Sequence, residues 1–373
     1  MPARAPDAVP EGNVREVAGL FLKLGTVAFG GPAAHIAMMH RECVEQRKWL
    51  SEQEFADLLG ACNLMPGPNS TELAFHIGLK RAGWKGLLAA LLFILPAVLI
   101  VSAIAWGYVR YGTLRAVQGI LVGIKPVLIA IILHAVWRLR RAVAKDAWTL
   151  AALVAAVGLH LLGVNELLVL FGAALAVTLP RLGPAPAKPM ALAWPVLAVP
   201  VMTGLELTVL FLVFLKIGAV LYGSGYVLLA FLEGDLVERL GWLTQAQLLD
   251  AVSIGQVTPG PVFTTATFIG YVVGGWPGAV VATIGIFLPG FVFVAATHRW
   301  IARLRDRPAT AAFLDGINAA AVGLMLSVTW TLGQTALIDA RTWALAAVAL
   351  ALLVRTRINP TWLIAAGAVV GLL

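Results

Sequence analysis

The sequence predicts an all-α protein that crosses a lipid bilayer many times and is built from two homologous halves. Hydrophobic residues make up 60% of the 373 residues and charged residues only 12%, and the mean hydropathy of +0.89 lies well above that of soluble chains. Uncharged runs of the length that a bilayer requires, about 20 residues, occur at 87–109 and 278–297. The segment 116–137 is also apolar, although it carries Lys125 and His134.

The N-terminal tail and the two cysteines add little to this fold. The first fourteen residues are polar and contain proline, without the apolar core and small-residue cleavage site of a signal peptide, so we expect a cytoplasmic tail. Cys43 and Cys62 are too few for a disulfide framework or a metal cluster, and we expect both to be packing residues. The net charge of +8 is spread over short loops, which favours membrane topology over a nucleic-acid-binding face.

A repeat with an offset of 193 residues defines the two halves. The stretch FLKLGTVAFGGP at 21–32 returns as FLKIGAVLYGSG at 214–225, and Pro-Gly-Pro at 66–68 returns at 259–261. We expect an N-terminal repeat over 1–180, a proline-rich linker over 181–203 that has room for one extra crossing, and a C-terminal repeat over 204–373. About six apolar segments in each repeat give 12 or 13 crossings.

Basic residues indicate that the two repeats have opposite orientations in the membrane. In the first repeat they follow the second and fourth apolar segments, whereas in the second repeat they follow the third segment. Because basic loops face the cytoplasm, this shift favours an inverted repeat. The residues concerned are Lys80, Arg81, Lys85, Arg138, Arg140, Arg141 and Lys145 in the first repeat and Arg299, Arg303, Arg305 and Arg307 in the second.

Each repeat carries two interruptions that a helix cannot continue through. Proline lacks an N–H donor and clashes with the preceding turn, so the helix stops and restarts. Restarting helices direct amide donors at a common point, which makes an anion site, and matching breaks in transporter repeats mark the substrate site. The alternative is a set of kinks that only help the helices to pack. The predicted substrate-binding residues are Gly30, Gly31, Pro32, His35, Pro66, Gly67, Pro68, Asn69, Ser70, Thr71, Gly223, Ser224, Gly225, Pro259, Gly260, Pro261, Thr264 and Thr265.

Three charged residues in apolar surroundings are candidates for anion attraction or coupling. Lys23 and Lys216 occupy equivalent positions seven residues before the first break, where an ammonium group must snorkel, pair or serve an anion. Glu72 has a threonine, Thr265, as its equivalent, and it either titrates during proton movement or lines a polar cavity. His35 either donates to an anion, carries a proton, or packs.

Enzyme motifs are missing from the sequence. It contains no phosphate-binding loop, no Gly-x-Ser-x-Gly elbow and no His-Glu-x-x-His zinc pair, so we expect neither an enzyme nor a cofactor or metal. Transport would then run on gradients or on the membrane potential.

Several motifs resemble the chromate ion transporter family in its two-domain form. They are FGGPAAHI at 29–36, RKWLSEQEFADLLGACNLMPGPNSTELAFHIG at 47–78, RAGWKG at 81–86 and GQVTPGPVFTTATFIGY at 255–271. The resemblance implies efflux of chromate, a tetrahedral dianion similar to sulfate, through a bacterial inner membrane, and hence chromate resistance. The motif positions are Gly30, Gly31, Pro32, His35 and the two Pro-Gly-Pro blocks. In the second repeat Gly-Ser-Gly replaces Gly-Gly-Pro, so the two half-sites need not bind alike.

The prediction is therefore a secondary transporter that binds a chromate- or sulfate-like oxyanion between its repeats and alternates access by rocking. A sulfate or other oxyanion permease of the same build is the first alternative. A membrane enzyme or scaffold for lipid-linked substrates is the second. The expected partners are the oxyanion and the bilayer, with a second copy of the chain as a further candidate and no nucleic acid.

Overall fold

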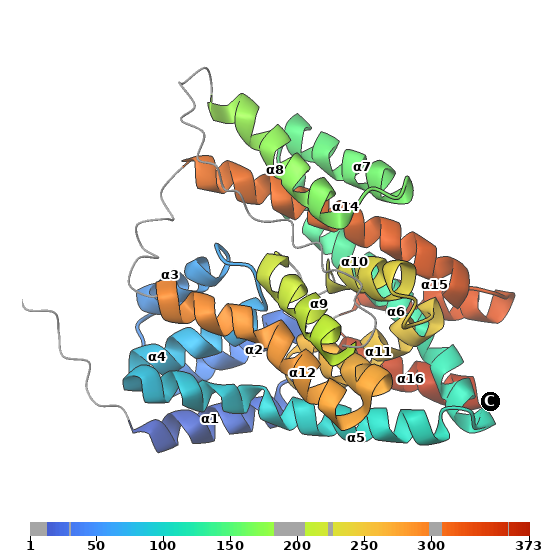
Figure 1. The fold of residues 1–373 in the computed structure, drawn as a ribbon, viewed down its shortest axis with the longest axis horizontal. Coiled ribbons are helices and arrows are strands. Elements are labelled where there is room, and N and C mark those ends of the chain that lie inside the picture. The colour runs from blue at the N-terminus through green and yellow to red at the C-terminus, as the bar shows by residue number, and fades with distance from the viewer. Residues whose placement is uncertain (1–12, 30, 183–205, 223–226, 298–307, 357) are drawn as a thin grey trace, which may run out of the picture.

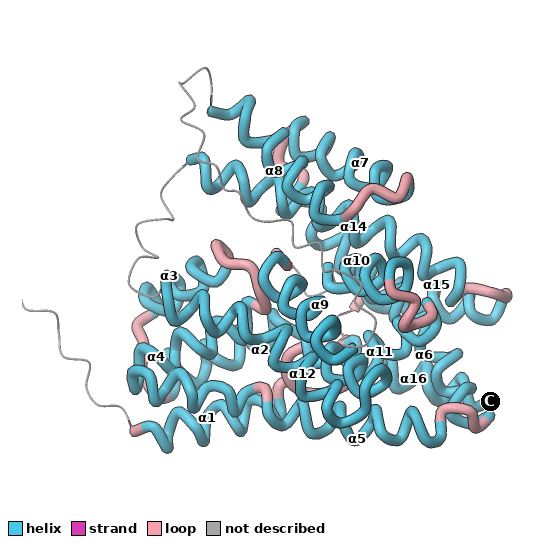
Figure 2. Tube along the Cα trace, in the orientation of Figure 1, coloured by secondary structure: helices cyan, strands magenta, loops and turns pink. Residues whose placement is uncertain are grey.

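The computed structural model describes residues 13–29, 31–182, 206–222, 227–297, 308–356 and 358–373. Over these ranges the chain is helical and contains no strand, as Figures 1 and 2 show, which confirms the all-α prediction. Four described helical stretches are long and apolar enough to cross a bilayer: Asn69–Tyr111, Arg115–Arg140, Val262–Thr297 and Ala309–Ala336. The predicted linker lies largely outside the described residues.

The helices of the second half recur in the order of those of the first half. The first half contains α1 (Val14–Val27), α2 (Gly31–His40), η1 (Arg41–Gln46), α3 (Glu52–Cys62), α4 (Asn69–Ala90), η2 (Leu91–Phe93), α5 (Leu95–Tyr111), α6 (Arg115–Val143), α7 (Ala147–Leu161) and α8 (Glu166–Leu182). The second half contains α9 (Glu206–Val220), α10 (Leu228–Leu232), η4 (Glu233–Arg239), α11 (Gln245–Val257), η5 (Val262–Thr264), α12 (Thr265–Thr297), α14 (Pro308–Ala336), α15 (Ala340–Arg355) and α16 (Pro360–Leu372). The long helices α6 and α14 begin and end 193 residues apart.

Helix caps recur at the same offset. Asp146 and Asp339 each accept a hydrogen bond at 2.8 Å from the backbone N–H three residues later, and so begin α7 and α15 in the same way. The backbone N–H of Thr149, together with the Arg181 guanidinium, lowers the pKa of Asp146 to about 2. Local capping signals were therefore duplicated together with the apolar pattern.

A reversal inside α4 turns the segment after the first Pro-Gly-Pro into a helical hairpin. Ala82 has φ −142° and Gly83 has φ +58°, both outside the helical region. A β-carbon added to Gly86 would lie 2.0 Å from the carbonyl oxygen of Gly78. Residues eight apart in a continuous helix are separated by about 12 Å, so the chain must fold back.

The same reversal occurs in α12, where Gly275 has φ +61° and Gly270 contacts Gly278. Each Pro-Gly-Pro is thus followed by a short helix, the turn, and a longer apolar helix. Trp84 and Trp276 follow the two turns and are 64% and 56% exposed, as expected of aromatic side chains at a membrane–water interface.

The packing exchanges helices between the repeats. Helix α14 packs on α7 and α8 of the first repeat, and α6 packs on α15 and α16 of the second. The first group occupies the upper part of Figure 1, while α1, α4 and α5 lie along the lower edge. Gly119 and Gly123 of α6 lie against Gly367 and Gly371 of α16, and these small residues let the two backbones approach closely.

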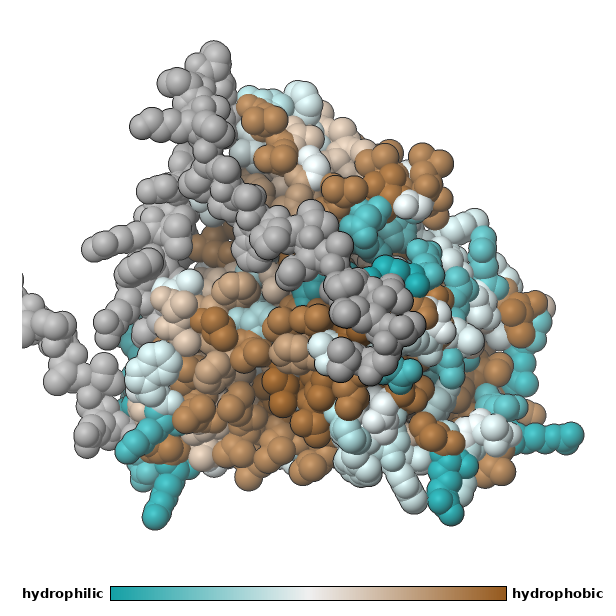
Figure 3. All heavy atoms as spheres, viewed as in Figure 1, coloured by the Kyte–Doolittle hydropathy of each residue, from teal (hydrophilic) through white to brown (hydrophobic). Residues whose placement is uncertain are grey.

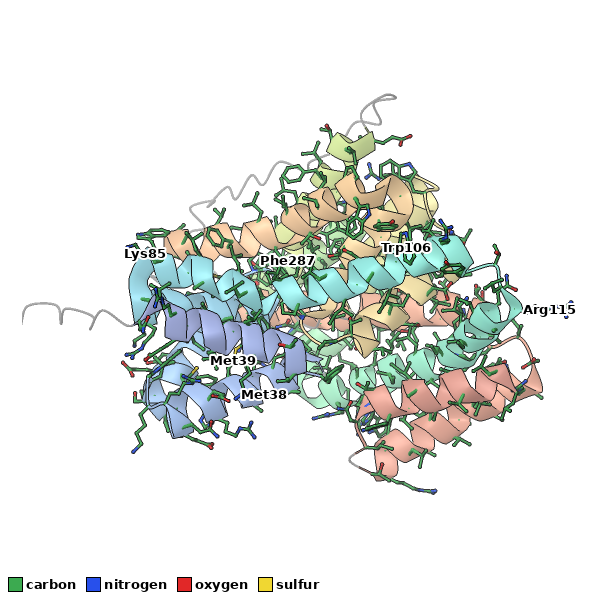
Figure 4. All side chains as sticks on the ribbon, turned by 90° about the horizontal axis from the view of Figure 1, so that it is seen from below. Met38, Met39, Lys85, Trp106, Arg115 and Phe287 are labelled. Atoms are coloured by element: carbon green, nitrogen blue, oxygen red, sulfur yellow. The ribbon has the colours of Figure 1, made fainter. Side chains whose placement is uncertain are left out.

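The outer surface is apolar over wide areas. Leu99, Val109 and Val154 are among many large aliphatic side chains that are more than half exposed. In Figure 3 the lower middle of the visible face is brown, with hydrophilic residues at the lower left and the lower right and a further group above the brown area, beside the grey atoms. In Figure 4 Lys85 and Arg115 lie towards opposite ends of the molecule, with Trp106 between them. A surface of this kind suits contact with lipid rather than water.

Candidate anion site

The two Pro-Gly-Pro turns hold the opposite repeat by reciprocal hydrogen bonds. The N–H of Gly67 donates to the carbonyl oxygen of Leu221 at 2.7 Å, and the N–H of Gly260 donates to that of Ala28 at 3.0 Å. Ala28 and Leu221 are themselves 193 residues apart, just after α1 and α9. Each turn therefore meets the end of the first helix of the other repeat.

Glycine is required at the centre of both turns. Gly67 has φ +136° and Gly260 has φ +89°, which side-chain-bearing residues rarely adopt. Space is also limited, because a β-carbon on Gly67 would lie 2.2 Å from Oε1 of Glu72 and one on Gly260 would lie 2.7 Å from Cβ of Ala97. Backbone conformation and close packing thus both require glycine where the two turns contact the opposite repeat.

A cavity of about 890 Å³ opens beside these breaks. Both repeats contribute residues to its wall. Those of the first repeat include the N-terminal ends of α2 and α4, where the first N–H groups of a helix have no intrahelical acceptor. Its described lining consists of Gly31, Pro32, Ala33, Ile36, Gly67, Pro68, Asn69, Ser70, Ile131, His134, Ala135, Arg138, Leu139, Pro261, Val262, Phe263, Leu353, Thr356, Ile358 and Pro360. The volume is within the usual range of ligand sites and leaves room for water around a small ion.

Arg138 is the one residue of this described lining that carries a full charge at neutral pH, and the lining contains no acid. It lies on α6, one helical turn after His134, which also lines the cavity. An arginine can offer several donors to the oxygens of one anion. Sequence reasoning missed this residue as part of the site, although the four-residue spacing from His134 at the end of an apolar run was a usable signal.

His35 connects the breaks of the first repeat. Its Nδ1 lies 3.3 Å from Oγ of Ser70, and its Nε2 lies 3.1 Å from the carbonyl oxygen of Ala28. The ring is buried against Phe93 and is not among the residues that line the cavity. It therefore orients Ser70, which does line the cavity.

The other predicted site residues either lie behind the wall of the cavity or fall outside the described residues. The hydroxyls of Thr264 and Thr265 donate to the backbone carbonyls of Pro261 and Val262 at 2.8 and 2.7 Å. Thr71 is fully buried. Pro66, Pro259 and Gly260 are buried and are not in the described lining. Gly30, Gly223, Ser224 and Gly225 lie outside the described residues.

Lys23 and Lys216 form equivalent ion pairs. Nζ of Lys23 lies 2.6 Å from Oε1 of Glu42, and Lys216 pairs with Asp235. The sequence left open whether each ammonium group snorkels, pairs or serves an anion, and both are paired. A role in attracting the anion stays a prediction. Lys125, which had no partner identifiable from sequence, lies 3.0 Å from Asp250 and joins α6 to α11.

The fold and the cavity together define a polytopic α-helical membrane protein with a chamber lined by the N-terminal ends of broken helices. The profile of the family described as "Chromate transporter" matches the chain twice, over residues 15–178 and 208–372, and the chain belongs to this family.

Relatives of similar length carry the corresponding names. The chain is 33% identical to the "Probable chromate transport protein" of Synechococcus elongatus over 91% of this chain and 90% of that protein. It is 32% identical to the "Chromate transport protein" of Cupriavidus metallidurans, over 97% and 94% of the two chains. It is 34% identical to the protein of the same name from Pseudomonas aeruginosa, over 89% and 85%. No solved structure matches.

Proposed function

We propose that this protein exports chromate across the bacterial inner membrane by alternating access, and thereby gives chromate resistance. The observation that carries the proposal is the cavity, which combines helix N-termini from the breaks with Arg138 and, in its described lining, has no acidic side chain. The names of the relatives support chromate as the substrate.

The donor set suits a doubly charged tetrahedral anion. Asn69 and Ser70 begin α4, where backbone N–H groups and the helix dipole favour negative charge. Weak donors spread around the ion allow release as well as binding, whereas several fixed ammonium groups would hold a dianion too tightly to let it pass. Arg138 supplies a single full charge beside them.

The position of the cavity bears on direction. It lies beside the last turns of α6, whose end carries Arg138 and Arg140. Basic helix ends face the cytoplasm under the positive-inside rule, so the proposed state is open to the cytoplasm and the N-terminus is cytoplasmic. A dianion leaving a negative interior also moves down the electrical gradient, at about 2.3 kcal/mol per charge per 100 mV.

Flux into and out of proteoliposomes tests the proposal. With the membrane potential and the pH gradient imposed separately, chromate should move in a protein-dependent manner and respond to the potential. Sulfate serves as the competing anion in the same assay. Preferred transport of sulfate would favour the alternative function, a sulfate permease, over chromate export. Absence of flux of either anion from correctly folded protein would exclude both.

A further inference from the structure

The side chain of Glu72 is buried directly behind the cavity wall. It has no exposed surface, and neither carboxyl oxygen has a hydrogen-bond partner in the described part of the chain. Oε1 lies 2.2 Å from the position that a β-carbon on Gly67 would occupy, and Gly67 lines the cavity. The carboxyl is therefore separated from the cavity by one backbone segment.

The second repeat shows that this fold does not require a carboxyl group here. Thr265 occupies the equivalent position, and its hydroxyl donates to the backbone carbonyl of Val262 at 2.7 Å. It faces Gly255, where the first repeat has Cys62. A hydroxyl with a local partner suffices in one repeat, so an unpaired carboxyl in the other points to a role beyond packing.

Protonation of Glu72 changes the charge at the N-terminal end of α4. Glu72 follows Asn69 and Ser70 by less than one turn, so its carboxylate would oppose the same helix-end potential that favours an anion in the cavity. Burying an unpaired carboxylate is also costly, whereas the neutral acid is tolerated much better. An anion in the cavity and a charge on Glu72 therefore disfavour each other.

We propose that Glu72 is a proton-binding site coupled to the anion cavity, so that proton and oxyanion bind to the same state of the protein. The inference rests on the proposed function, because it assigns a coupling group to that cavity. Linkage is reciprocal: a proton on Glu72 strengthens anion binding by the same factor by which the anion strengthens proton binding.

Few other groups around Glu72 can account for such coupling. Cys62 at the end of α3 and Tyr222 after α9 are its titratable neighbours from other elements, and such groups ordinarily titrate at about 8.5 and 10. His76 lies one turn further along α4. Helix α12, which places Gly290 against Glu72, contains no Asp, Glu, Lys, Arg or His. In the cavity region, His134 and His35 would act in the same direction when protonated, and a Glu72 variant that keeps both histidines separates their effect from that of Glu72.

Binding of sulfate and chromate to the purified full-length protein, measured by calorimetry between pH 5.5 and 8.5, tests the inference. Sulfate is the cleaner probe, because it stays a dianion over this range while chromate itself takes up a proton. Wild-type protein should bind sulfate about tenfold more weakly at the high end of the range, a factor typical of coupled sites, and should take up protons on binding in weakly buffered solution.

Two substitutions of Glu72 and one control decide the assignment. Glu72→Gln should bind sulfate at all pH values as tightly as wild type does at low pH, without proton uptake. Glu72→Thr, which copies the second repeat, should also lose the pH dependence. His134→Gln should keep it. Retention of the pH dependence in Glu72→Gln, or its loss in His134→Gln, would overturn the assignment.

The two proposals fail differently. Wild-type protein that binds anions with no proton uptake and no pH dependence removes the coupling role of Glu72 and leaves the proposed function standing. Folded wild-type protein that binds neither anion at any pH removes the proposed function itself.

Discussion

The first and second repeats have matching helices but contribute unequally to the cavity. In the first repeat the positions after Pro-Gly-Pro are Asn69 and Ser70, and α6 adds His134 and Arg138. At the same offset the second repeat has Val262 and Phe263 after its turn, and Ser327 and Thr331 on α14. The backbone scaffold is thus shared, while the polar and charged groups are concentrated in the first repeat.

This difference teaches that repeat symmetry and chemical symmetry are separable. The two turns must match because each donates a hydrogen bond to a backbone carbonyl of the other repeat. The side chains beyond the turns are free of that constraint, so the polar set of one repeat need not recur in the other. Four sets of substitutions test how far the two repeats differ, beginning with the largest expected effect.

Alanine in place of Gly260 or Gly67 should abolish most of the flux. Both positions have positive φ, where a side chain costs about 1–3 kcal/mol, and both lack space for a β-carbon. The obstacles differ, since Glu72 blocks position 67 and Ala97 blocks position 260. Glu72→Thr should therefore partly rescue Gly67→Ala and leave Gly260→Ala unrescued.

Gly19→Ala is the matched control for these variants. Nothing lies within 4 Å of a β-carbon at Gly19 in α1, so flux should be unchanged. Flux assays in proteoliposomes check all the variants, and full activity of Gly260→Ala would contradict the reciprocal turn contacts.

Replacing the lysine of each of the two equivalent ion pairs should lower the stability of the protein by different amounts. The side chain of Lys216 is 8% exposed and that of Lys23 is 54% exposed. Lys216→Met should lower the free energy of unfolding by about 3 kcal/mol, because breaking a buried pair leaves an uncompensated charge. Arg239, 3.0 Å from Asp235, keeps the loss near the lower end of the range for such pairs.

Lys23→Met should cost less, about 1 kcal/mol, because the Lys23 side chain is half exposed in the folded protein and Arg47 stays 3.2 Å from the buried Glu42. Thermal unfolding of the two variants in the same detergent gives the comparison. Equal losses would mean that the difference in exposure between the pairs has no energetic consequence.

Neutralising Arg138 should weaken anion binding. Loss of hydrogen bonds from a charged donor costs about 1.5–3 kcal/mol, so Arg138→Gln should raise the KM for chromate roughly 10- to 150-fold. Thr331→Val, at the equivalent position of the second repeat, should leave the KM unchanged.

Arg140→Gln is the charge-matched control, since its guanidinium lies 3.2 Å from the ring centroid of Trp137 and the residue is not in the described cavity lining. A similar rise in KM for the variants at 138 and 140 would show that Arg138 acts only through its general positive charge and not through a specific contact in the cavity.

The smallest expected effect concerns the hydroxyl groups after the two turns. Ser70→Ala removes the partner of Nδ1 of His35 at the cavity wall. Loss of one hydrogen bond costs about 1 kcal/mol, so the KM should rise several-fold. Thr264→Val removes a hydroxyl that donates to the backbone carbonyl of Pro261 and should lower stability by a similar amount without changing the KM. An equal change in KM for both variants would show that the second repeat contributes as much as the first.

Much of the scaffold could be predicted from the sequence because its signals are local and duplicated. Pro-Gly-Pro fixes where the helices stop, and the 193-residue offset relates the helices of the two halves. The inverted orientation and the domain boundaries stay predictions. A loop at Lys80, Arg81 and Lys85, between two apolar segments, was predicted from the basic residues. The tight packing of the two segments against each other was not predicted, and the contacts of Gly78 with Gly86 and of Gly270 with Gly278 show it in both repeats.

The cavity was predicted less completely than the scaffold, because its members meet only in three dimensions. The turns and the start of α4 were identified from the breaks. Arg138 was assigned to a basic loop, because its spacing from His134 relates it to one helix face but not to Pro68, which lines the same cavity from another part of the chain. Lys23 and Lys216 were recognised as costly, but their partners Glu42 and Asp235 follow nineteen residues later in each repeat and were not identified.

The reciprocal bonds at Gly67 and Gly260 also restrict how the molecule can move. Two fixed points define one line, and a rotation about that line leaves both bonds intact, whereas sliding of one half past the other stretches both at once. A rotation of one half against the other that keeps both bonds would therefore turn about a line through the two turns, immediately beside the cavity. Under the proposed function, a small rotation about this line would change which side of a bound anion meets water, while the hydrogen bonds between the halves at Gly67 and Gly260 are kept.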